Sequence, residues 1–277
     1  MNPRFALGLK LAVALPLVGC ATLLGLDEDR EIRAGSGGGG GIGDGGAGGD
    51  GTGGAEARYV AAVLADAPVA FFRFEETSGP FVDSIDPERA FTVLGTVEHA
   101  APGAVGAGVG FNGGSGRLVL GPADFGFVGT APMTIEAWAR TANASTFQDV
   151  VGKFDVDGTE EAGYALRFRP GMEYGWFFSR ANPTGSRNMR GYLTPDVYAH
   201  IVMTFDGTAS VLYLNGAQVD SQADASDISL PSTPSPFRVG GLETGNAFSG
   251  TLDELAIYDE PLSADRVLAH YEAGSTP

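Results

Sequence analysis

The residues from Pro68 to Tyr258 form a succession of short runs rich in β-branched and aromatic side chains, separated by turn residues. Many such runs in one segment predict β-strands that pack as an all-β sandwich or barrel. The dipeptide Asn215-Gly216 between two runs is typical of a hairpin turn. Helices are expected only at the ends, over Ala55–Ala67 and from an N-cap at Ser263 to a stop at Gly274.

A glycine-rich tract separates this β-rich segment from the N-terminus. Of the 21 residues from Ala34 to Gly54, 14 are glycine. Chain of this composition is flexible and cannot form a hydrophobic core. We therefore expect residues 20–57 to be a linker and residues 58–274 to be one domain, long enough to bury a single large core.

The first 20 residues resemble the signal of a bacterial lipoprotein. Positive charge at Arg4 and Lys10 accompanies a short apolar stretch, and Leu17-Val18-Gly19-Cys20 resembles a lipobox. The resemblance implies that residues 1–19 are a signal peptide removed by cleavage and that Cys20 carries a lipid. The expected location is the cell envelope, at the outer membrane of a Gram-negative bacterium, with the domain periplasmic or on the surface. The alternative is an ordinary secretory signal with an incidental cysteine.

Charge and cysteine content limit the partners and the means of stabilisation. The chain has 34 acidic residues against 17 Lys and Arg, a formal net charge of −17. Nucleic-acid phosphates repel such a chain, so we expect no nucleic-acid binding. Cys20 is the single cysteine, so no disulfide can stabilise the domain and its core must do so alone.

Six sequence blocks, in order along the chain, resemble those of laminin-G-like domains of the concanavalin A type. One of them has the sequence MTIEAW and another VLYLNG. The six blocks are Ala70–Gly79, Phe111–Gly113, Met133–Trp138, Tyr198–Gly207, Val211–Gly216 and Gly250–Asp259. The resemblance implies a jelly-roll sandwich of two antiparallel sheets, flanked by short helices, in which the first and last strands are neighbours.

Glycoside hydrolases share that fold. They need two carboxylates on one face of one strand, two or four residues apart, to flank the bond that is cleaved. Asp253 and Glu254 are adjacent in sequence, so strand alternation is expected to place them on opposite faces. No expected strand offers a pair at a spacing of two or four. His200 lies within one of the six blocks and is expected to pack or cap. We therefore expect a protein that is not an enzyme.

The resemblance also implies a structural calcium ion. In many sandwiches of this type an aspartate of the final strand binds calcium, and Ca²⁺ takes six to eight oxygen ligands. Asp253 is the expected ligand, with Asp83 and Asn112 as companions. Asp253 is expected on the core-facing side of its strand, with Leu255 and Ile257. The alternative is that Asp253 caps backbone N–H groups.

One further expectation concerns an ion pair between the first and last strands. Arg73 in the first strand and Glu254 in the last are expected to form an ion pair across the neighbouring terminal strands.

A ligand-binding face is expected from aromatic and polar side chains that alternate along two strands. Trp138 shares a face with Glu136 and Arg140, and Tyr174 shares one with Trp176. Such a surface can stack on a sugar ring and bond its hydroxyl groups. The alternative is that these aromatic side chains fill the space between the sheets.

These features together predict an envelope-anchored, non-catalytic recognition module that binds a glycan or a protein partner and is attached to the membrane through lipid at Cys20. One alternative is a carbohydrate-active enzyme whose catalytic carboxylates come from loops. Another is a passive structural lipoprotein of the envelope.

Overall fold

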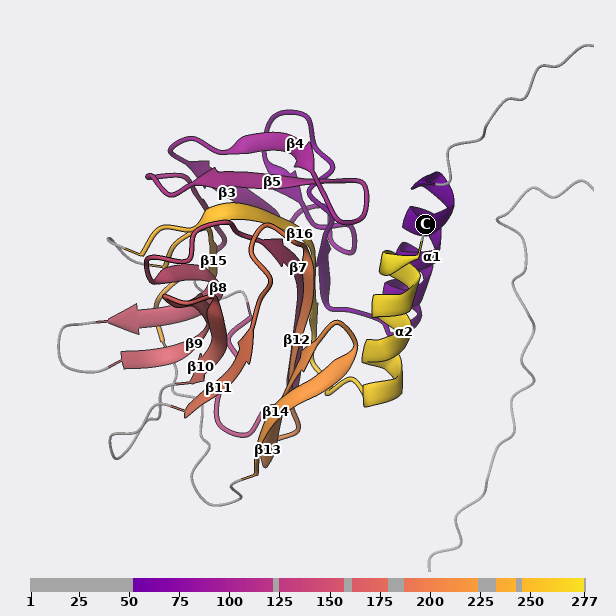
Figure 1. Ribbon diagram of the computed structural model, residues 1–277, viewed down its shortest axis with the longest axis vertical. Coiled ribbons are helices and arrows are strands. Elements are labelled where there is room, and N and C mark those ends of the chain that lie inside the picture. The colour runs from indigo at the N-terminus through magenta and orange to yellow at the C-terminus, as the bar shows by residue number, and fades with distance from the viewer. Residues whose placement is uncertain are drawn as a thin grey trace, which may run out of the picture. The chain divides into compact units, whose positions relative to one another are not determined.

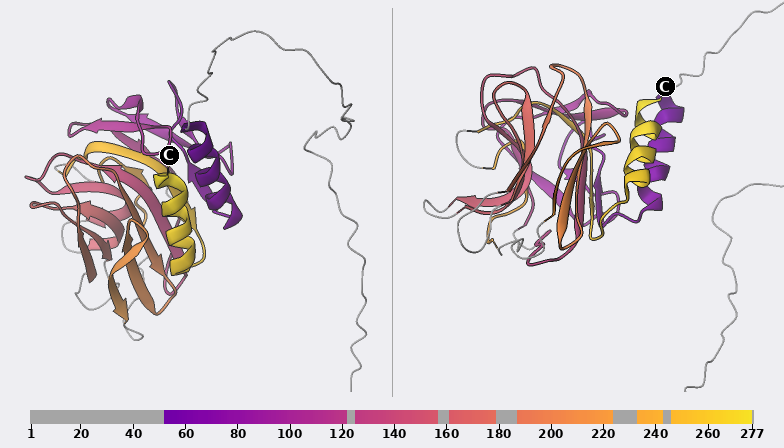
Figure 2. Two further views of the ribbon diagram at one scale, coloured as in Figure 1. Left: turned by 45° about the vertical axis from the view of Figure 1, so that its right-hand side comes forward. Right: turned by 60° about the horizontal axis from the view of Figure 1, so that its bottom comes forward.

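The computed structural model describes residues 52–121, 125–156, 161–178, 187–223, 233–242 and 246–276. Within them, two antiparallel sheets stack face to face, and two helices lie side by side against the outer face of one sheet (Figures 1 and 2). The all-β sandwich of two antiparallel sheets expected from the sequence is confirmed.

The first sheet contains the N-terminal and C-terminal strands. Its members are β1 (Ala70–Phe72), β4 (Glu98–Pro102), β5 (Ala107–Asn112), β7 (Met133–Arg140), β12 (Ala199–Phe205), β13 (Ala209–Leu214), β14 (Ala217–Ala223) and β16 (Ser249–Tyr258). Their order is β14-β13-β12-β7-β16-β5-β4, and β1 pairs antiparallel with β16 off this path. The first and last strands are therefore neighbours, as expected.

The second sheet covers the inner face of the first. Its members are β2 (Phe81–Val82), β3 (Ala90–Leu94), β6 (Arg117–Val119), β8 (Gln148–Val156), β9 (Glu161–Phe168), β10 (Glu173–Phe178), β11 (Arg187–Tyr192) and β15 (Arg238–Val239). Their order is β11-β10-β9-β8-β15-β6-β3-β2. The main core lies between the sheets and includes Ile135, Leu255 and Ile257 from the first sheet and Leu166 and Val239 from the second.

Several strands lack the alternation of apolar and polar residues by which a strand is predicted from sequence. β14 lies at the edge of its sheet and most of its side chains are exposed, so it lacks the apolar alternation of a half-buried strand. β5, with the sequence AGVGFN, contains glycines at close approaches between strands: a Cβ at Gly108 would lie 2.8 Å from the carbonyl oxygen of Leu252.

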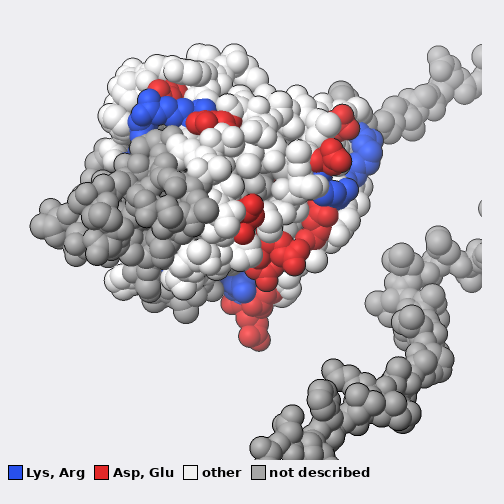
Figure 3. Space-filling view, turned by 90° about the horizontal axis from the view of Figure 1, so that it is seen from below, with Lys and Arg blue, Asp and Glu red and all other residues white. Residues whose placement is uncertain are grey.

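The two helices enclose a second, smaller core on the outer face of the first sheet. Tyr59 and Val63 of α1 (Thr52–Ala65) and several residues of α2 (Ala264–Ser275) pack there against Phe71, Trp138 and Tyr258. Seen from below, Asp and Glu side chains gather towards the side of the helices (Figure 3). Neither helix has the length and apolar character required to cross a membrane, as far as the described residues extend.

The ends of both helices differ from expectation. α1 begins at Thr52, inside the segment 20–57 that was expected to be linker. Ser263 is the N-cap of α2 as expected, but the helix continues past Gly274 to Ser275. Gly274 is needed for close packing, since a Cβ there would lie 2.8 Å from the Trp138 ring and 2.9 Å from the Tyr59 ring.

Candidate functional site

A β-bulge in β16 determines which side chains face the helices. Asp253 and Ala256, three positions apart, lie opposite two residues of β7 that are only two positions apart. Glu254 within the bulge has a positive φ of 51°. Leu255 and Ile257 consequently face the main core, whereas Ala256 belongs to the core beneath the helices. The expectation that Asp253 shares a face with Leu255 and Ile257 is wrong, because the extra residue reverses the alternation.

The centre of the helix-covered face is the carboxylate of Glu136, which is fully buried. Its Oε1 atom accepts hydrogen bonds from the Tyr59 hydroxyl and from Nε2 of His200, each at 2.8 Å. Its Oε2 atom accepts from Nδ1 of His270 at 2.9 Å and from the Tyr258 hydroxyl at 3.2 Å. These four donors come from α1, β12, α2 and β16, so a single carboxylate joins four elements.

The donors also determine the protonation state of this carboxylate. Burial alone would raise the pKa of Glu136, but the charge of His270 and the hydrogen bonds from His200 and His270 hold it well below its usual range. The ionised form can accept hydrogen bonds from all four of these groups at once.

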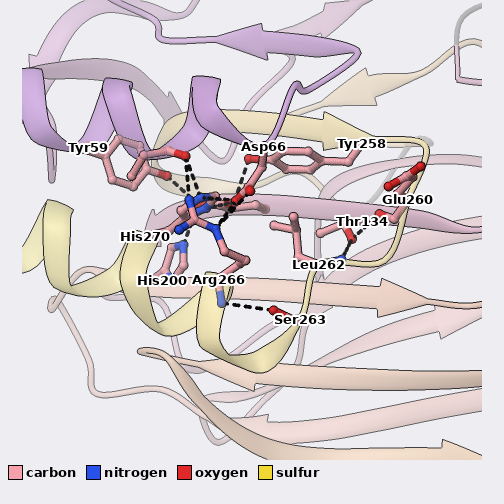
Figure 4. Close-up of polar contacts among 12 residues, drawn as sticks. Tyr59, Asp66, Thr134, His200, Tyr258, Glu260, Leu262, Ser263, Arg266 and His270 are labelled. Atoms are coloured by element: carbon pink, nitrogen blue, oxygen red, sulfur yellow. Dashed lines mark hydrogen bonds and ion pairs between the residues drawn. The ribbon is translucent and has the colours of Figure 1, made fainter.

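His270 connects this carboxylate to α1 (Figure 4). Its Nε2 atom lies 2.9 Å from Oδ2 of Asp66 and 3.0 Å from the carbonyl oxygen of Ala62. Both ring nitrogens thus face oxygen atoms that carry no hydrogen, an arrangement that needs the doubly protonated imidazolium. Burial lowers the pKa of His270, but the carboxylates of Glu136 and Asp66 outweigh it, so the pKa is raised above its ordinary value.

The outer end of this chain of contacts is an ion pair. Nε of Arg266 lies 2.8 Å from Oδ2 of Asp66, and Nη2 of Arg266 donates to the carbonyl oxygen of Ala62 at 3.2 Å. Glu136, Asp66, His270 and Arg266 therefore form a charge-balanced group of two carboxylates and two cations. We call Tyr59, Asp66, Glu136, His200, Tyr258, Arg266 and His270 the helix clasp.

The expected ion pair between Arg73 and Glu254 is present. Nη2 of Arg73 lies 3.1 Å from Oε1 of Glu254, whose side chain is fully buried. The same guanidinium also lies 2.8 Å from Oε1 of Glu56 in α1 and 3.1 Å from Oε1 of Glu75. Arg73 thus joins the bulge to α1 as well as to the first strand.

The bulge buries the two adjacent carboxylates of Asp253 and Glu254 together, which overturns the expectation that they point to opposite faces. Burial raises the pKa of both groups well above the usual range, and the charge of Asp253 adds to this rise for Glu254. The opposing effects are smaller: backbone N–H groups of Val105 and Ala104 act on Asp253, and Arg73 acts on Glu254. One oxygen of each, Oδ1 of Asp253 and Oε2 of Glu254, has no hydrogen-bond partner.

The three expected calcium ligands each have separate partners. Oδ2 of Asp253 accepts from the backbone N–H groups of Ala104 at 2.8 Å and Val105 at 2.9 Å, the capping role given above as the alternative. Asp83 pairs with Arg89 at 2.6 Å. Asn112 is exposed and accepts from its own turn.

The strand register separates Asn112 from Asp253 as well. Asn112 lies opposite Ser249, four residues before Asp253 in β16, a distance of roughly 13 Å along a strand. The described residues contain no group of three or more His, Cys, Asp or Glu side chains that could hold a metal ion. The unpartnered oxygens of Asp253 and Glu254 suit Ca²⁺ chemically, but two oxygens fall short of its coordination number. These residues therefore do not fit the expected calcium site.

The residues expected to bind ligand are mostly internal. Glu136 belongs to the helix clasp, and Trp138 is 4% exposed and lies between the rings of Tyr59 and Tyr271. Tyr174 is buried in the main core. The side chain of Trp176 lies outside the described part of the structure, as does Cys20.

Arg140 is the remaining residue of that set, and it reaches the surface. Its guanidinium lies 5.0 Å from the centre of the Tyr198 ring and its side chain is 33% exposed. Asp196 lies beside it, with Oδ1 3.9 Å from Nε.

The helix clasp was not expected from the sequence. Tyr59 and Val63 recur at helical spacing, as do Val267, His270 and Tyr271. This spacing indicated that both terminal helices have a packed face, and it was the available signal that they cover a sheet.

Comparisons with known proteins give a family and a set of similar folds. The profile of the Concanavalin A-like lectin/glucanases superfamily matches residues 112–268, more than half of the chain. Among curated proteins, none matches the chain.

Solved structures with the same fold are binding domains of clostridial toxins. The botulinum neurotoxin serotype D binding domain superposes with a TM-score of 0.62 at 12% identity, over 76% of this chain and 52% of that one. The binding domain of Paraclostridial Mosquitocidal Protein 1 gives 0.63 at 16% identity, over 76% and 52%. A serotype D domain in complex with N-acetylneuraminic acid gives 0.60 at 13% identity, also over 76% and 52%. This chain thus spans about half the length of these structures, and the likeness shows the fold.

We expect the substitution Glu136→Gln to destabilise the domain by about 3–5 kcal/mol, because it removes a buried charge and leaves the imidazolium of His270 with only one of its two carboxylate partners. The free energy of unfolding from urea titration measures the effect. Glu272→Gln, an exposed carboxylate on α2, is the matched control and should change stability by less than about 0.5 kcal/mol. A small effect at Glu136 would show that its carboxylate does not hold the helices.

We expect excess Ca²⁺ and a chelator to give the same melting temperature, because the expected ligands are not assembled in the described residues. A ligand that binds only the folded state raises the melting temperature by mass action. A higher melting temperature in Ca²⁺ that Asp253→Asn abolishes would contradict this expectation and would assign the ion to the unpartnered oxygens beside the bulge.

Proposed function

We propose that this chain, which belongs to the concanavalin A-like lectin/glucanase superfamily, is a non-catalytic module that recognises a glycan or a protein partner. The observation that carries the proposal is that its clustered carboxylates are buried and bonded within the protein. Glu136, Asp253 and Glu254 are all fully buried, and each is bonded to the protein itself. Glycoside hydrolysis needs two carboxyl groups that flank a substrate bond, and these three reach no substrate.

The Arg140–Tyr198 patch, formed by Arg140, Tyr198 and Asp196, is the surface we assign to ligand. It is the exposed remainder of the face that the sequence indicated for binding, since the helices cover Trp138 and Glu136. An aromatic ring offers an apolar surface for a sugar ring, and the guanidinium and the exposed Asp196 carboxylate offer donors and acceptors to hydroxyl groups.

The similar structures support recognition as the class of function. Their titles describe binding domains, and one of those proteins is in complex with N-acetylneuraminic acid. The net charge of −17 and the acidic side chains towards the helices (Figure 3) disfavour a polyanionic partner there. A neutral glycan or a protein surface suits the patch better than a nucleic acid.

We place the module at the cell envelope. Residues 1–19 serve as a lipoprotein signal peptide, lipid on Cys20 attaches the chain to the outer membrane, and the glycine-rich chain that follows is the tether. This assignment rests on the lipobox sequence Leu17-Val18-Gly19-Cys20. A tethered recognition module can search for ligand while it stays attached to its membrane.

We expect the purified chain to bind members of a glycan array without hydrolysing them. Arg140→Ala should weaken that binding at least about tenfold, because it removes one charge-assisted hydrogen bond to the ligand. Arg117→Ala, on the second sheet, is the matched control and should leave affinity unchanged. Turnover of any bound glycan would overturn the non-catalytic assignment. An array and a pull-down that both capture nothing would favour the passive envelope lipoprotein instead.

We expect Cys20→Ser to move the chain from the membrane fraction to the soluble fraction of cells that express it, because its hydroxyl group cannot receive the lipid thioether. The measurement is fractionation followed by immunoblotting, with incorporation of labelled fatty acid as a second readout. A serine variant that stays with the membrane would contradict lipid anchoring at this residue.

A further inference from the structure

The contact between α1 and α2 contains a polar group whose geometry depends on one proton. His270 in α2 lies with Nε2 2.9 Å from Oδ2 of Asp66 and 3.0 Å from the carbonyl oxygen of Ala62. Ala62 belongs to α1, and Asp66 is the first residue after the end of α1. Neither acceptor can supply a hydrogen, so the contact exists only while Nε2 is protonated.

We propose that His270 is a proton-operated latch that holds α1 against α2, and that loss of its proton at mildly alkaline pH releases α1 from the face of the sheet. The latch is separate from the Arg140–Tyr198 patch and does not depend on the proposed function.

The charged groups around His270 make its proton necessary. Glu136 faces it from β7, Asp66 faces it from the end of α1, and Arg266 lies beside it on α2. With His270 protonated, the two carboxylates and two cations balance. Loss of the proton leaves one uncompensated negative charge in a largely buried group, which is costly.

The neighbouring tyrosines do not replace that charge. The hydroxyl groups of Tyr59 and Tyr258 stay neutral, because burial and the charge of Glu136 raise the pKa of both well above the ordinary value. His200 reaches Oε1 of Glu136 from β12, on the other side of the carboxylate, and its Nδ1 atom has no partner.

Release affects α1 rather than α2. A neutral ring keeps one hydrogen, and we infer that it stays on Nδ1, because Glu136 is fully buried whereas Asp66 is partly exposed to water; α2 then stays attached to the sheet. Its Nε2 lone pair then faces Asp66 and the carbonyl oxygen of Ala62, and these contacts become repulsive. Of the two helices, α1 therefore loses the bond.

A cleft gives solvent a route to the latch. It has a volume of about 340 Å³ and is lined by residues that include Asp66, Ala67, Tyr258, Ser263 and Arg266. Asp66, whose side chain is 17% exposed, lines this cleft and contacts Nε2 of His270 (Figure 4). Protons can thus exchange through Asp66 without the domain unfolding.

The direction of the pH effect follows from linkage. The closed state holds the His270 proton more tightly than the open state, which keeps the carboxylate of Glu136 beside the ring but loses that of Asp66. The stabilisation that this proton gives is therefore lost as the pH rises from the pKa of the open state through the higher pKa of the closed state. Over that interval the open fraction rises roughly tenfold per pH unit, the slope for one proton.

Opening would change both the tether and the surface. α1 follows the glycine-rich tract, and its release adds its 14 residues to the chain that precedes the sandwich. Tyr59 and Val63 cover Trp138 and Phe71, so departure of α1 exposes an aromatic surface. The Tyr59 ring lies 6.2 Å from that of Trp138, which makes tryptophan emission a local reporter.

The test measures α1 release in the full chain with the background substitution Trp176→Phe, which leaves Trp138 as the sole tryptophan. Amide hydrogen exchange of residues 52–65, corrected for the intrinsic effect of pH, and Trp138 emission are recorded between about pH 6 and pH 10. We expect the open fraction of α1 to rise roughly tenfold per pH unit over part of this range while the strands stay protected. Flat exchange and emission would overturn the proposal.

Variants assign the titrating group. His270→Gln should raise the open fraction at pH 6 and remove its pH dependence. His99→Gln is the control, a half-buried histidine whose contacts are with Gly79 and Phe81, and it should behave as the parent chain. If His270→Gln does not fold, Asp66→Asn supplies the test: removal of this carboxylate should shift the rise to lower pH. The buried pair of Asp253 and Glu254 is the competing source. A rise that persists in His270→Gln and disappears in Asp253→Asn would overturn the latch.

Discussion

The carboxylate of Glu136 is the interaction on which the arrangement of the helices depends. A buried ionised group is tolerated only when its charge is balanced and its lone pairs are satisfied, and Glu136 meets both conditions through donors on four separate elements. The sheet thereby specifies the positions of α1 and α2. Apolar packing around Trp138 alone would allow the helices to slide, since hydrophobic burial has little directionality.

The bulge at Glu254 is the second constraint, and it acts on the same face. One inserted residue lets Asp253 cap the Ala104–Val105 turn while Glu254 pairs with Arg73. Arg73 in turn reaches Glu56 of α1. The bulge and the helix clasp therefore hold α1 at two points, one near its start and one at its end.

The pattern of short strand-like runs predicted the sandwich. The resemblance of six sequence blocks to laminin-G-like domains implied the neighbouring terminal strands, and from these the Arg73–Glu254 pair was expected. The sequence indicated the wrong face for Asp253, because alternation can be counted only where the register is unbroken and nothing in the residues themselves marks the bulge. It indicated Trp138 and Glu136 as a binding surface since a strand with polar and aromatic side chains facing outward looks solvated. Whether helices cover that face depends on contacts between residues far apart in sequence, such as Tyr59 with Glu136.

The weakest of these elements is α1, for reasons visible in its composition. It has 14 residues, begins with Thr-Gly-Gly and carries neither an acidic residue in its first turn nor a basic residue in its last. A helix of this length is marginal in water on its own, so α1 owes its structure to Tyr59, Val63 and the polar contacts at its ends. Detachment and loss of helix should therefore be one event. A small change in the charge of the clasp then produces a large change in the chain that precedes the sandwich, whereas the sandwich, held by its own core, stays folded.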